Sequence, residues 1–179
     1  MIDALIGNRD RHLGNWGVLE KDGVFEVAPV YDCGSSLNAW LEDEEMEKIL
    51  TTAKPQLKNN SYNVRSCYSI NGKRIVYHEI FKNPPDDLKT AIKRVVPNVD
   101  MAKIYAIIDE TPEMSDVRKQ YLKQSVELRY KEILVPALER ELNRKPSLDE
   151  TLKSNAEKSK EMFGDKPTVS QKSRNDLEL

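Results

Sequence analysis

The sequence predicts a mainly helical protein that carries one or two small β-hairpins. The hairpins are predicted because Asp22-Gly23 and Asn71-Gly72 each separate two apolar runs, and these dipeptides tolerate the positive φ angles of a tight turn. The helices are predicted because apolar residues between positions 84 and 137 recur at spacings of three and four. We therefore expect the hairpins to be local additions to an α-helical fold.

The first third of the chain is expected to alternate short elements with loops. The apolar segment 2–7 predicts a short helix that ends at Gly7, and the polar segment 8–15 predicts a loop. The first hairpin is expected to join WGVLE to VFEVAPVY. A helix is then expected within residues 37–50, followed by a loop over residues 51–63.

The rest of the ordered chain is expected to hold a second hairpin and three helices. The hairpin would join SCYSI to RIVYHEIF. The apolar stripes of the three helices are, in chain order, Leu88, Ile92 and Val95; Met101, Ile104, Tyr105 and Ile108; and Leu122, Val126, Tyr130, Ile133 and Ala137. Pro97 is expected to end the first of these helices, Ser115 to cap the third, and Pro136 to kink or split the third.

Composition suggests one domain and a tail. Residues 1–145 contain the predicted elements, whereas residues 146–179 are poor in apolar residues and rich in charge. A helix within residues 148–162 and disorder beyond Gly164 are expected in this tail.

Overall composition excludes several classes of protein. There are 28 basic and 30 acidic residues, so we expect no direct nucleic-acid binding of the sequence-independent kind. Cys33 and Cys67 make no disulfide framework, and together with His12 and His78 they lack the spacing of a zinc site. No apolar run approaches the roughly 20 residues of a membrane span, and no signal peptide is visible, so we expect no membrane contact and a cytoplasmic location.

Three polar residues form the strongest chemical signal. Asp10 and Asn15 lie five residues apart in one loop, and Asp32 follows 17 residues after Asn15, behind the first hairpin. Phosphoryl transfer from ATP uses one carboxylate to orient or deprotonate an acceptor hydroxyl, while an amide oxygen and a second carboxylate hold Mg²⁺. Because the hairpin returns the chain to its starting end, Asn15 and Asp32 are expected to meet.

The surrounding residues strengthen this interpretation. The stretches LIGNRDRHLGNWGVL and VAPVYDCGSS, within roughly residues 5–37, resemble the HipA-like serine/threonine kinases. The string D-R-H-x-x-N also occurs in the phosphatidylinositol 3/4-kinase superfamily, and Asp32-Cys33-Gly34 keeps the D-x-G form of the protein-kinase D-F-G motif. The resemblance implies the C-terminal lobe of a protein-kinase-like fold. It also implies transfer of the ATP γ-phosphate to a protein Ser or Thr.

The resemblance also implies a role for each residue of the motif. The catalytic loop 8–15 would supply Asp10 as the catalytic base, with His12 supporting the loop. Asn15 and Asp32, the latter in the metal-binding loop 31–36, would bind Mg²⁺ and with it the nucleotide. Arg11 would contact phosphate or the loop itself.

The N-terminal lobe of a kinase is not recognisable in the sequence. Nine residues precede Asp10, and no G-x-G-x-x-G or V-A-I-K-type strand follows it. We therefore expect the isolated chain to be inactive as an ATP-dependent kinase. It could be a truncated frame, a fragment, or a subunit completed by a separate N-lobe or regulatory protein, with a protein substrate as the other partner.

Two alternative functions remain open at this point. One is a catalytically silent interaction module, either a toxin–antitoxin-type component or a scaffold. The other is a fragment of a phosphoinositide-kinase-like lipid kinase, which the absence of a basic amphipathic helix argues against. Ser35 and Ser36 are candidate regulatory positions, and Trp16 and Trp40 are expected to pack rather than to stack on a nucleotide base.

Overall fold

The computed structural model describes residues 1–70, 72–144, 151–152 and 154–158. Contacts between Cα atoms divide the chain into two units, Met1–Asn143 and Arg144–Leu179. In the second unit, residues 151–152 and 154–158 are helical. The rest of the helix expected at 148–162, and the disorder expected beyond Gly164, lie outside the described residues.

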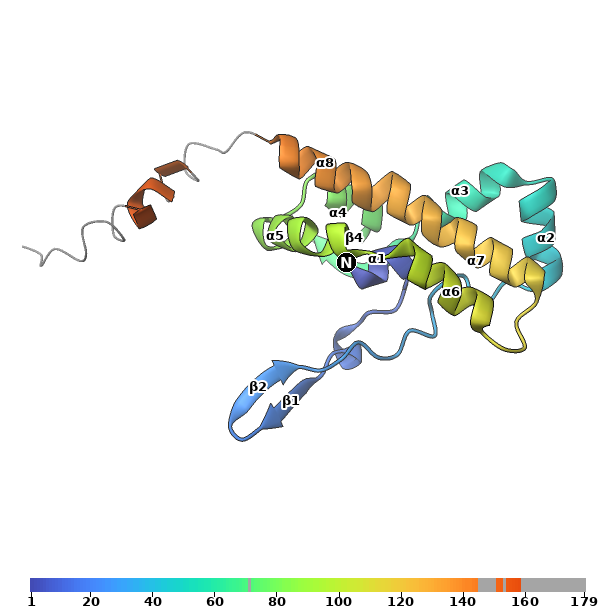
Figure 1. Cartoon of the computed structure of the whole chain (residues 1–179), viewed down its shortest axis with the longest axis horizontal. Coiled ribbons are helices and arrows are strands. Elements are labelled where there is room, and N and C mark those ends of the chain that lie inside the picture. The colour runs from blue at the N-terminus through green and yellow to red at the C-terminus, as the bar shows by residue number, and fades with distance from the viewer. Residues whose placement is uncertain (71, 145–150, 153, 159–179) are drawn as a thin grey trace, which may run out of the picture. The chain divides into compact units, whose positions relative to one another are not determined.

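The first unit is mainly helical with two small antiparallel hairpins, which confirms the predicted fold class (Figure 1). Its α-helices are α1 (Ile2–Ile6), α2 (Asp43–Thr51), α3 (Lys54–Tyr62), α4 (Tyr77–Lys82), α5 (Asp86–Val95), α6 (Met101–Glu110), α7 (Asp116–Arg129) and α8 (Val135–Asn143). Its strands are β1 (Val18–Lys21), β2 (Val24–Val27), β3 (Arg65–Ile70) and β4 (Lys73–Val76). Short 3₁₀ turns occur at Leu13–Asn15 and Val96–Asn98.

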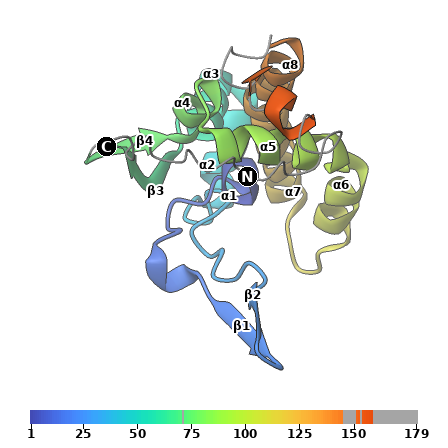
Figure 2. The ribbon, with the colours of Figure 1, turned by 90° about the vertical axis from the view of Figure 1, so that its left-hand side faces the viewer.

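Local turn chemistry forms both hairpins. Asp22 and Gly23 have φ angles of 54° and 78°, as the two-residue β1–β2 turn requires, and Gly72 has a φ of 76° in the β3–β4 turn. The β1–β2 hairpin extends away from the helices in both views (Figures 1 and 2). The second hairpin is shorter than predicted, because the chain turns into α4 at Tyr77 instead of continuing as a strand.

Two sequence-based expectations between the hairpins are wrong. The helix expected over 37–50 begins only at Asp43, because Leu37 and Asn38 adopt φ angles of 56° and 54° that no right-handed helix contains. The loop expected over 51–63 is instead the helix α3. Its sequence is almost wholly polar, but Leu57 and Ser61, four residues apart, face the interior and are buried.

The C-terminal helices follow the predicted pattern more closely. The Oγ of Ser115 accepts a hydrogen bond from the Arg118 N–H at 3.1 Å, which caps α7 as expected. The interruption expected at Pro136 takes the form of a π-helical turn just before the proline. A π-helical turn over Tyr130–Leu134 joins α7 to α8 and accommodates the proline, whose ring would otherwise press on the preceding turn.

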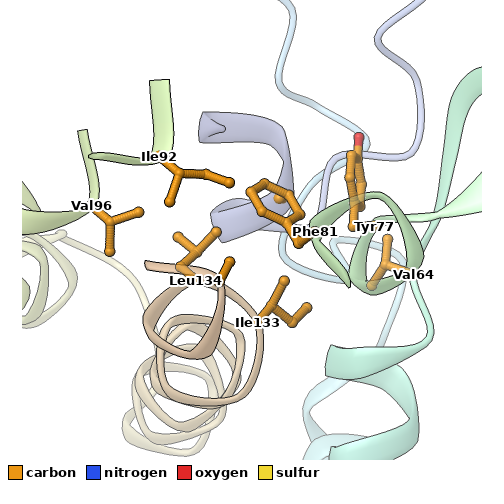
Figure 3. Packing of buried hydrophobic residues seen from close by; sticks show 9 residues of the cluster. Val64, Tyr77, Phe81, Ile92, Val96, Ile133 and Leu134 are labelled. Atoms are coloured by element: carbon orange, nitrogen blue, oxygen red, sulfur yellow. The ribbon is translucent and has the colours of Figure 1, made fainter. Parts of the chain in front are cut away.

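Two clusters of buried apolar side chains hold these helices together. The first lies between α1, α4, α5 and the π-helical turn (Figure 3). It consists of Ala4, Val64, Tyr77, Phe81, Ile92, Val96, Ile133, Leu134 and Ala137. The second lies between α2, α3, α6 and α7 and consists of Leu41, Met46, Ile49, Leu57, Ile108, Tyr121 and Leu122. Because Ala4 belongs to the first cluster, the chain enters the 8–15 loop from a fixed position.

Gly7 sets the direction in which the chain leaves α1. Its φ of 67° ends the helix as the sequence predicts, and the buried guanidinium of Arg129 lies directly against it. The Nε of Arg129 donates to the Ser61 carbonyl oxygen at 3.2 Å, so α7, α3 and α1 meet at this side chain. Burial lowers the pKa of Arg129 to about 10.

We predict that Gly7→Ala destabilises the protein. A Cβ at this position would lie 2.6 Å from a nitrogen of Arg129, on a backbone conformation that L-residues avoid. The strain and the overpacking together should cost about 2–5 kcal/mol, measured by urea denaturation. Gly34→Ala is the matched control, since nothing lies within 4 Å of a Cβ there. Equal stability of both variants would contradict the prediction.

Candidate active site

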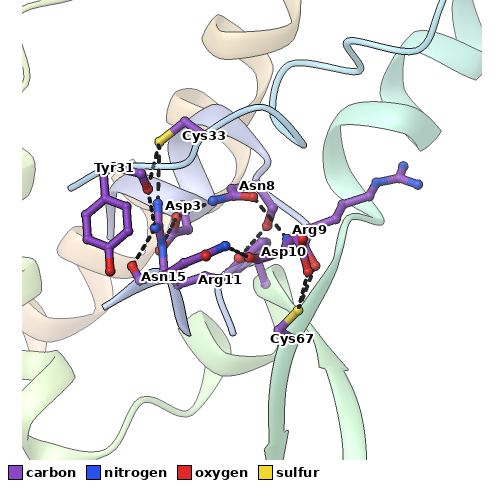
Figure 4. Close-up of polar contacts among 10 residues, drawn as sticks. Asp3, Asn8, Arg9, Asp10, Arg11, Asn15, Tyr31, Cys33 and Cys67 are labelled. Atoms are coloured by element: carbon purple, nitrogen blue, oxygen red, sulfur yellow. Dashed lines mark hydrogen bonds and ion pairs between the residues drawn. The ribbon is translucent and has the colours of Figure 1, made fainter. Parts of the chain in front are cut away.

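Arg11 connects the two loops that flank the β1–β2 hairpin. Its side chain is buried, and Nε donates to Asp3 Oδ1 on α1 at 3.0 Å. Its Nη1 donates to the carbonyl oxygen of Asn15 at 2.9 Å and to that of Tyr31 at 2.6 Å (Figure 4). One guanidinium nitrogen therefore holds together the end of the 8–15 loop and the start of the 31–36 loop.

The remaining donors of Arg11 are also directed at the protein. Its Nη2 lies 3.4 Å from the sulfur of Cys33, in the second loop. The contact with phosphate that the kinase resemblance allowed for Arg11 therefore finds no support in the geometry, whereas a contact with the loop is what the structure shows. We interpret Arg11 as a residue that positions the two loops.

Hydrogen bonds of Asn8, the first residue of the 8–15 loop, and of Asp3 on α1 hold the loop in place. Asn8 is fully buried, and its Nδ2 donates to Asp3 Oδ1 at 2.9 Å, the oxygen that also accepts from Arg11. Its Oδ1 accepts from the Asp10 N–H at 3.0 Å, and its carbonyl oxygen accepts from the Tyr77 hydroxyl at 2.6 Å. Burial raises the pKa of Tyr77 well above its ordinary value, so this hydroxyl remains a hydrogen-bond donor.

Asn15 folds back on the same loop. It is buried, and its Nδ2 donates to the Asp10 carbonyl oxygen at 2.7 Å. Since the amide nitrogen is used inside the loop, the side-chain oxygen Oδ1 is the atom through which Asn15 could bind a metal ion.

The carboxylate of Asp10 is exposed at the surface of the loop. Its Oδ2 lies 4.0 Å from Nε2 of His12, and its Oδ1 lies 3.7 Å from the sulfur of Cys67 on β3. His12 is half-exposed, and its Nδ1 accepts from the Gly14 N–H at 3.0 Å. This bond to the backbone fits the supporting role that the sequence suggested for His12.

Asp32 occupies an unusual backbone conformation. It is exposed and has a φ of 51°, immediately after Tyr31, whose carbonyl oxygen is bound by Arg11. Because Arg11 binds the Asn15 and Tyr31 carbonyls with the same nitrogen, the backbone at Asn15 lies beside that of Tyr31, the residue before Asp32. An amide oxygen and a carboxylate are hard donors of the kind that Mg²⁺ prefers. Within the described residues, no three His, Cys, Asp or Glu side chains gather as they would around a zinc ion.

An open pocket adjoins this site. Arg11 and Asn15 line it together with Trp16 and Tyr31, which are half-exposed or exposed aromatic side chains. Trp40 is not among the residues that line this pocket; its ring lies 4.2 Å from the guanidinium of Arg9 in the 8–15 loop. Trp16 is thus at the site, while Trp40 packs against a charged side chain.

Sequence reasoning missed the residues that hold the site in place. Asp3 carries a weak local signal, because it is the one charged residue in the apolar segment IDALI. Tyr77 and Cys67 carry no such signal, since they lie 69 and 57 residues from the atoms they contact.

Comparison with known proteins identifies relatives of the chain. It is 34% identical over 139 residues to the serine/threonine-protein kinase CtkA of Helicobacter pylori, which is 75% of this chain and 42% of that protein. The crystal structure of the H. pylori proinflammatory kinase CtkA matches with a TM-score of 0.73 at 34% identity, over 80% of this chain and 51% of the solved chain. No protein-family model matches the sequence. The chain thus spans about half of the kinase to which it is similar.

We predict that Arg11→Lys destabilises the site and the fold. A lysine carries one compact ammonium group and cannot reach Asp3, Asn15 and Tyr31 together as the planar guanidinium does. It would leave buried polar groups unpaired, at an expected cost of about 3 kcal/mol in urea denaturation. Arg94→Lys, at an exposed position of α5, is the control and should be neutral. A neutral Arg11→Lys variant would contradict the role we assign to Arg11.

Proposed function

We propose that the chain, which is similar to a serine/threonine-protein kinase, forms the C-terminal catalytic lobe of a HipA-like enzyme. The lobe would transfer the γ-phosphate of ATP to a Ser or Thr of a protein substrate. The observation that supports this proposal is that Arg11 binds the carbonyl oxygens of both Asn15 and Tyr31, which brings the end of the 8–15 loop next to the residue that precedes Asp32.

Each residue has a separate task in the proposed reaction. The exposed carboxylate of Asp10 accepts the proton of the acceptor hydroxyl while the acceptor oxygen bonds to phosphorus and the bond to ADP breaks. Asn15 fixes the backbone of Asp10 through its Nδ2. Asn15 Oδ1 and the Asp32 carboxylate would hold Mg²⁺, which when bound neutralises charge on the phosphates. His12 keeps the turn at Gly14 closed.

A further lobe is needed to cover the phosphates of ATP. The β1–β2 hairpin supports this proposal, since it leaves large apolar side chains in solvent where a second lobe could cover them. These are Val18, Leu19, Val24, Phe25 and Val27, with exposed fractions between 53% and 70%. We propose that this hairpin contacts the part of the kinase that the match does not include, whether in a longer chain or in a separate subunit. The described chain alone would then be inactive.

One alternative keeps specific support. The same exposed apolar hairpin would suit a catalytically silent interaction module, such as a scaffold or a toxin–antitoxin-type component. The complete set of Asp10, Asn15 and Asp32 favours the kinase instead. A cytoplasmic location remains part of the proposal; no helix in the described ranges is long and apolar enough to cross a lipid bilayer.

Calorimetric titration with a non-hydrolysable ATP analogue tests the proposal. We predict Mg²⁺-dependent binding to the chain that weakens at least about tenfold in Asp32→Asn, a loss of about 1.4 kcal/mol, because the variant lacks one charged metal ligand. Asp22→Asn is a matched control, since Asp22 is also an exposed aspartate with a positive φ and lies in the hairpin turn.

Two results would contradict the proposal. Absence of Mg²⁺-dependent binding in the wild-type chain would favour the silent module. Equal loss in Asp32→Asn and Asp22→Asn would show that net charge rather than a metal ligand governs binding. Transfer of γ-phosphate by the purified chain, abolished by Asp10→Ala, would contradict the expectation that the chain alone is inactive while supporting the kinase.

A further inference from the structure

We propose that the β3–β4 hairpin is a docking site for an acidic segment of the protein substrate. The proposal rests on the proposed kinase function and adds a substrate class to it. The acidic side chains would flank the Ser or Thr that receives the phosphate. Their carboxylates would contact the cationic side chains of the hairpin, beside the catalytic base.

All the charged side chains of the β3–β4 hairpin are basic. Residues 65–76 include Arg65, Lys73 and Arg74 and no Asp or Glu, in a chain whose net charge is −2. All three side chains are exposed, and none forms an ion pair with a carboxylate in the part of the chain that the structure describes. The charge of this hairpin is therefore not neutralised from within the described chain.

Some exposed lysines elsewhere on the protein do have carboxylate partners. Lys58 pairs with Glu132 across two helices, at 3.2 Å. Lys131 pairs with Glu127 within one helix, at 2.5 Å. At these two positions a carboxylate neutralises the lysine, whereas the three cations of the hairpin have no such partner among the described residues.

Contacts with the catalytic loop place this charge beside Asp10. The thiol of Cys67, on β3, lies 2.9 Å from the Arg9 carbonyl oxygen and 3.7 Å from Asp10 Oδ1. Arg74 Nη2, on β4, lies 3.9 Å from the same sulfur. One cysteine side chain therefore separates an exposed arginine from the carboxylate of the proposed base. Burial raises the pKa of Cys67 despite the opposing charge of Arg74, so Cys67 remains a neutral thiol in this position.

The position of the β3–β4 hairpin suits a contact with the protein substrate rather than with the nucleotide. In Figure 4, Cys67 lies next to Asp10, and Cys33 of the proposed metal-binding loop lies on the opposite side of the site. The phosphates would lie on the side of Asn15 and Asp32, whereas the acceptor hydroxyl must approach Asp10. Residues of an extended peptide follow one another at about 3.3 Å, so side chains two or three positions from the acceptor could reach the hairpin.

A peptide-binding measurement tests the proposal without requiring phosphoryl transfer. Two fluorescent peptides would be compared by anisotropy, one with a central Ser flanked by Glu and one in which Gln replaces every Glu. We expect the chain to bind the acidic peptide at least about fivefold more tightly, with the difference shrinking as salt rises.

Charge-neutralised variants localise the effect. The triple variant Arg65→Gln, Lys73→Gln, Arg74→Gln should bind both peptides equally, with an unchanged melting temperature. The control variant Lys58→Gln, Lys103→Gln, Lys131→Gln removes the same charge from exposed helical positions and should keep the preference. The proposal is overturned if the two peptides bind equally to the wild type, if both triple variants lose the preference alike, or if oligo-dT binds more tightly than the acidic peptide.

Peptide binding and nucleotide binding test the docking proposal and the kinase proposal separately. Nucleotide binding with no preference for the acidic peptide would overturn the docking site and leave the kinase proposal standing. A preference lost only in the hairpin variant, without nucleotide binding, would support an acidic-peptide site on a protein that is not a kinase by itself.

Discussion

The buried guanidinium of Arg11 is the interaction on which the rest of the site depends. Burying a cation is costly unless its charge is paired and its N–H groups are bonded, and Arg11 meets both conditions. Asp3 supplies the opposite charge, and two backbone carbonyls together with the Cys33 sulfur accept the remaining bonds. Because these partners come from α1, from the 8–15 loop and from the loop after β2, one side chain fixes all three segments.

A second buried arginine contacts the C-terminal end of α1. Arg129 packs flat against Gly7 and donates to Ser61, but its Nη1 and Nη2 have no hydrogen-bond partner among the described residues. The depressed pKa of Arg129 expresses the cost of that burial. The short helix α1 is thus contacted by two guanidinium groups, one that binds its Asp3 and one that packs on Gly7 at its C-terminal end. This constraint explains why so short a helix can orient a loop.

The two hairpins give the protein two surfaces of opposite chemistry. The β1–β2 hairpin is exposed and apolar, which suits a partner that removes it from water, such as the remaining part of a kinase. The β3–β4 hairpin is exposed and basic, which suits a charged ligand that remains partly solvated. The candidate catalytic residues lie between these surfaces, so the proposed nucleotide side and the proposed substrate side are chemically distinct.

Sequence alone determined the features that depend on near neighbours in the chain. The turns at Asp22-Gly23 and Gly72, the end of α1 at Gly7 and the Ser115 cap each result from backbone preferences over a few residues. Sequence also supplied the motif of Asp10, Asn15 and Asp32 and, through it, the kinase relationship.

Only the tertiary structure decided which residues far apart in the sequence come into contact. The polar segment of α3 is helical because α7 buries one face of it, and its own sequence contains no apolar stripe that predicts this. The role of Arg11 became visible only with Asp3 and Tyr31 in contact, and the place of Cys67 only with Asp10 beside it. Local propensities act within a few residues, whereas desolvation and pairing of buried charge are properties of the packed chain, and packing is what selected these contacts.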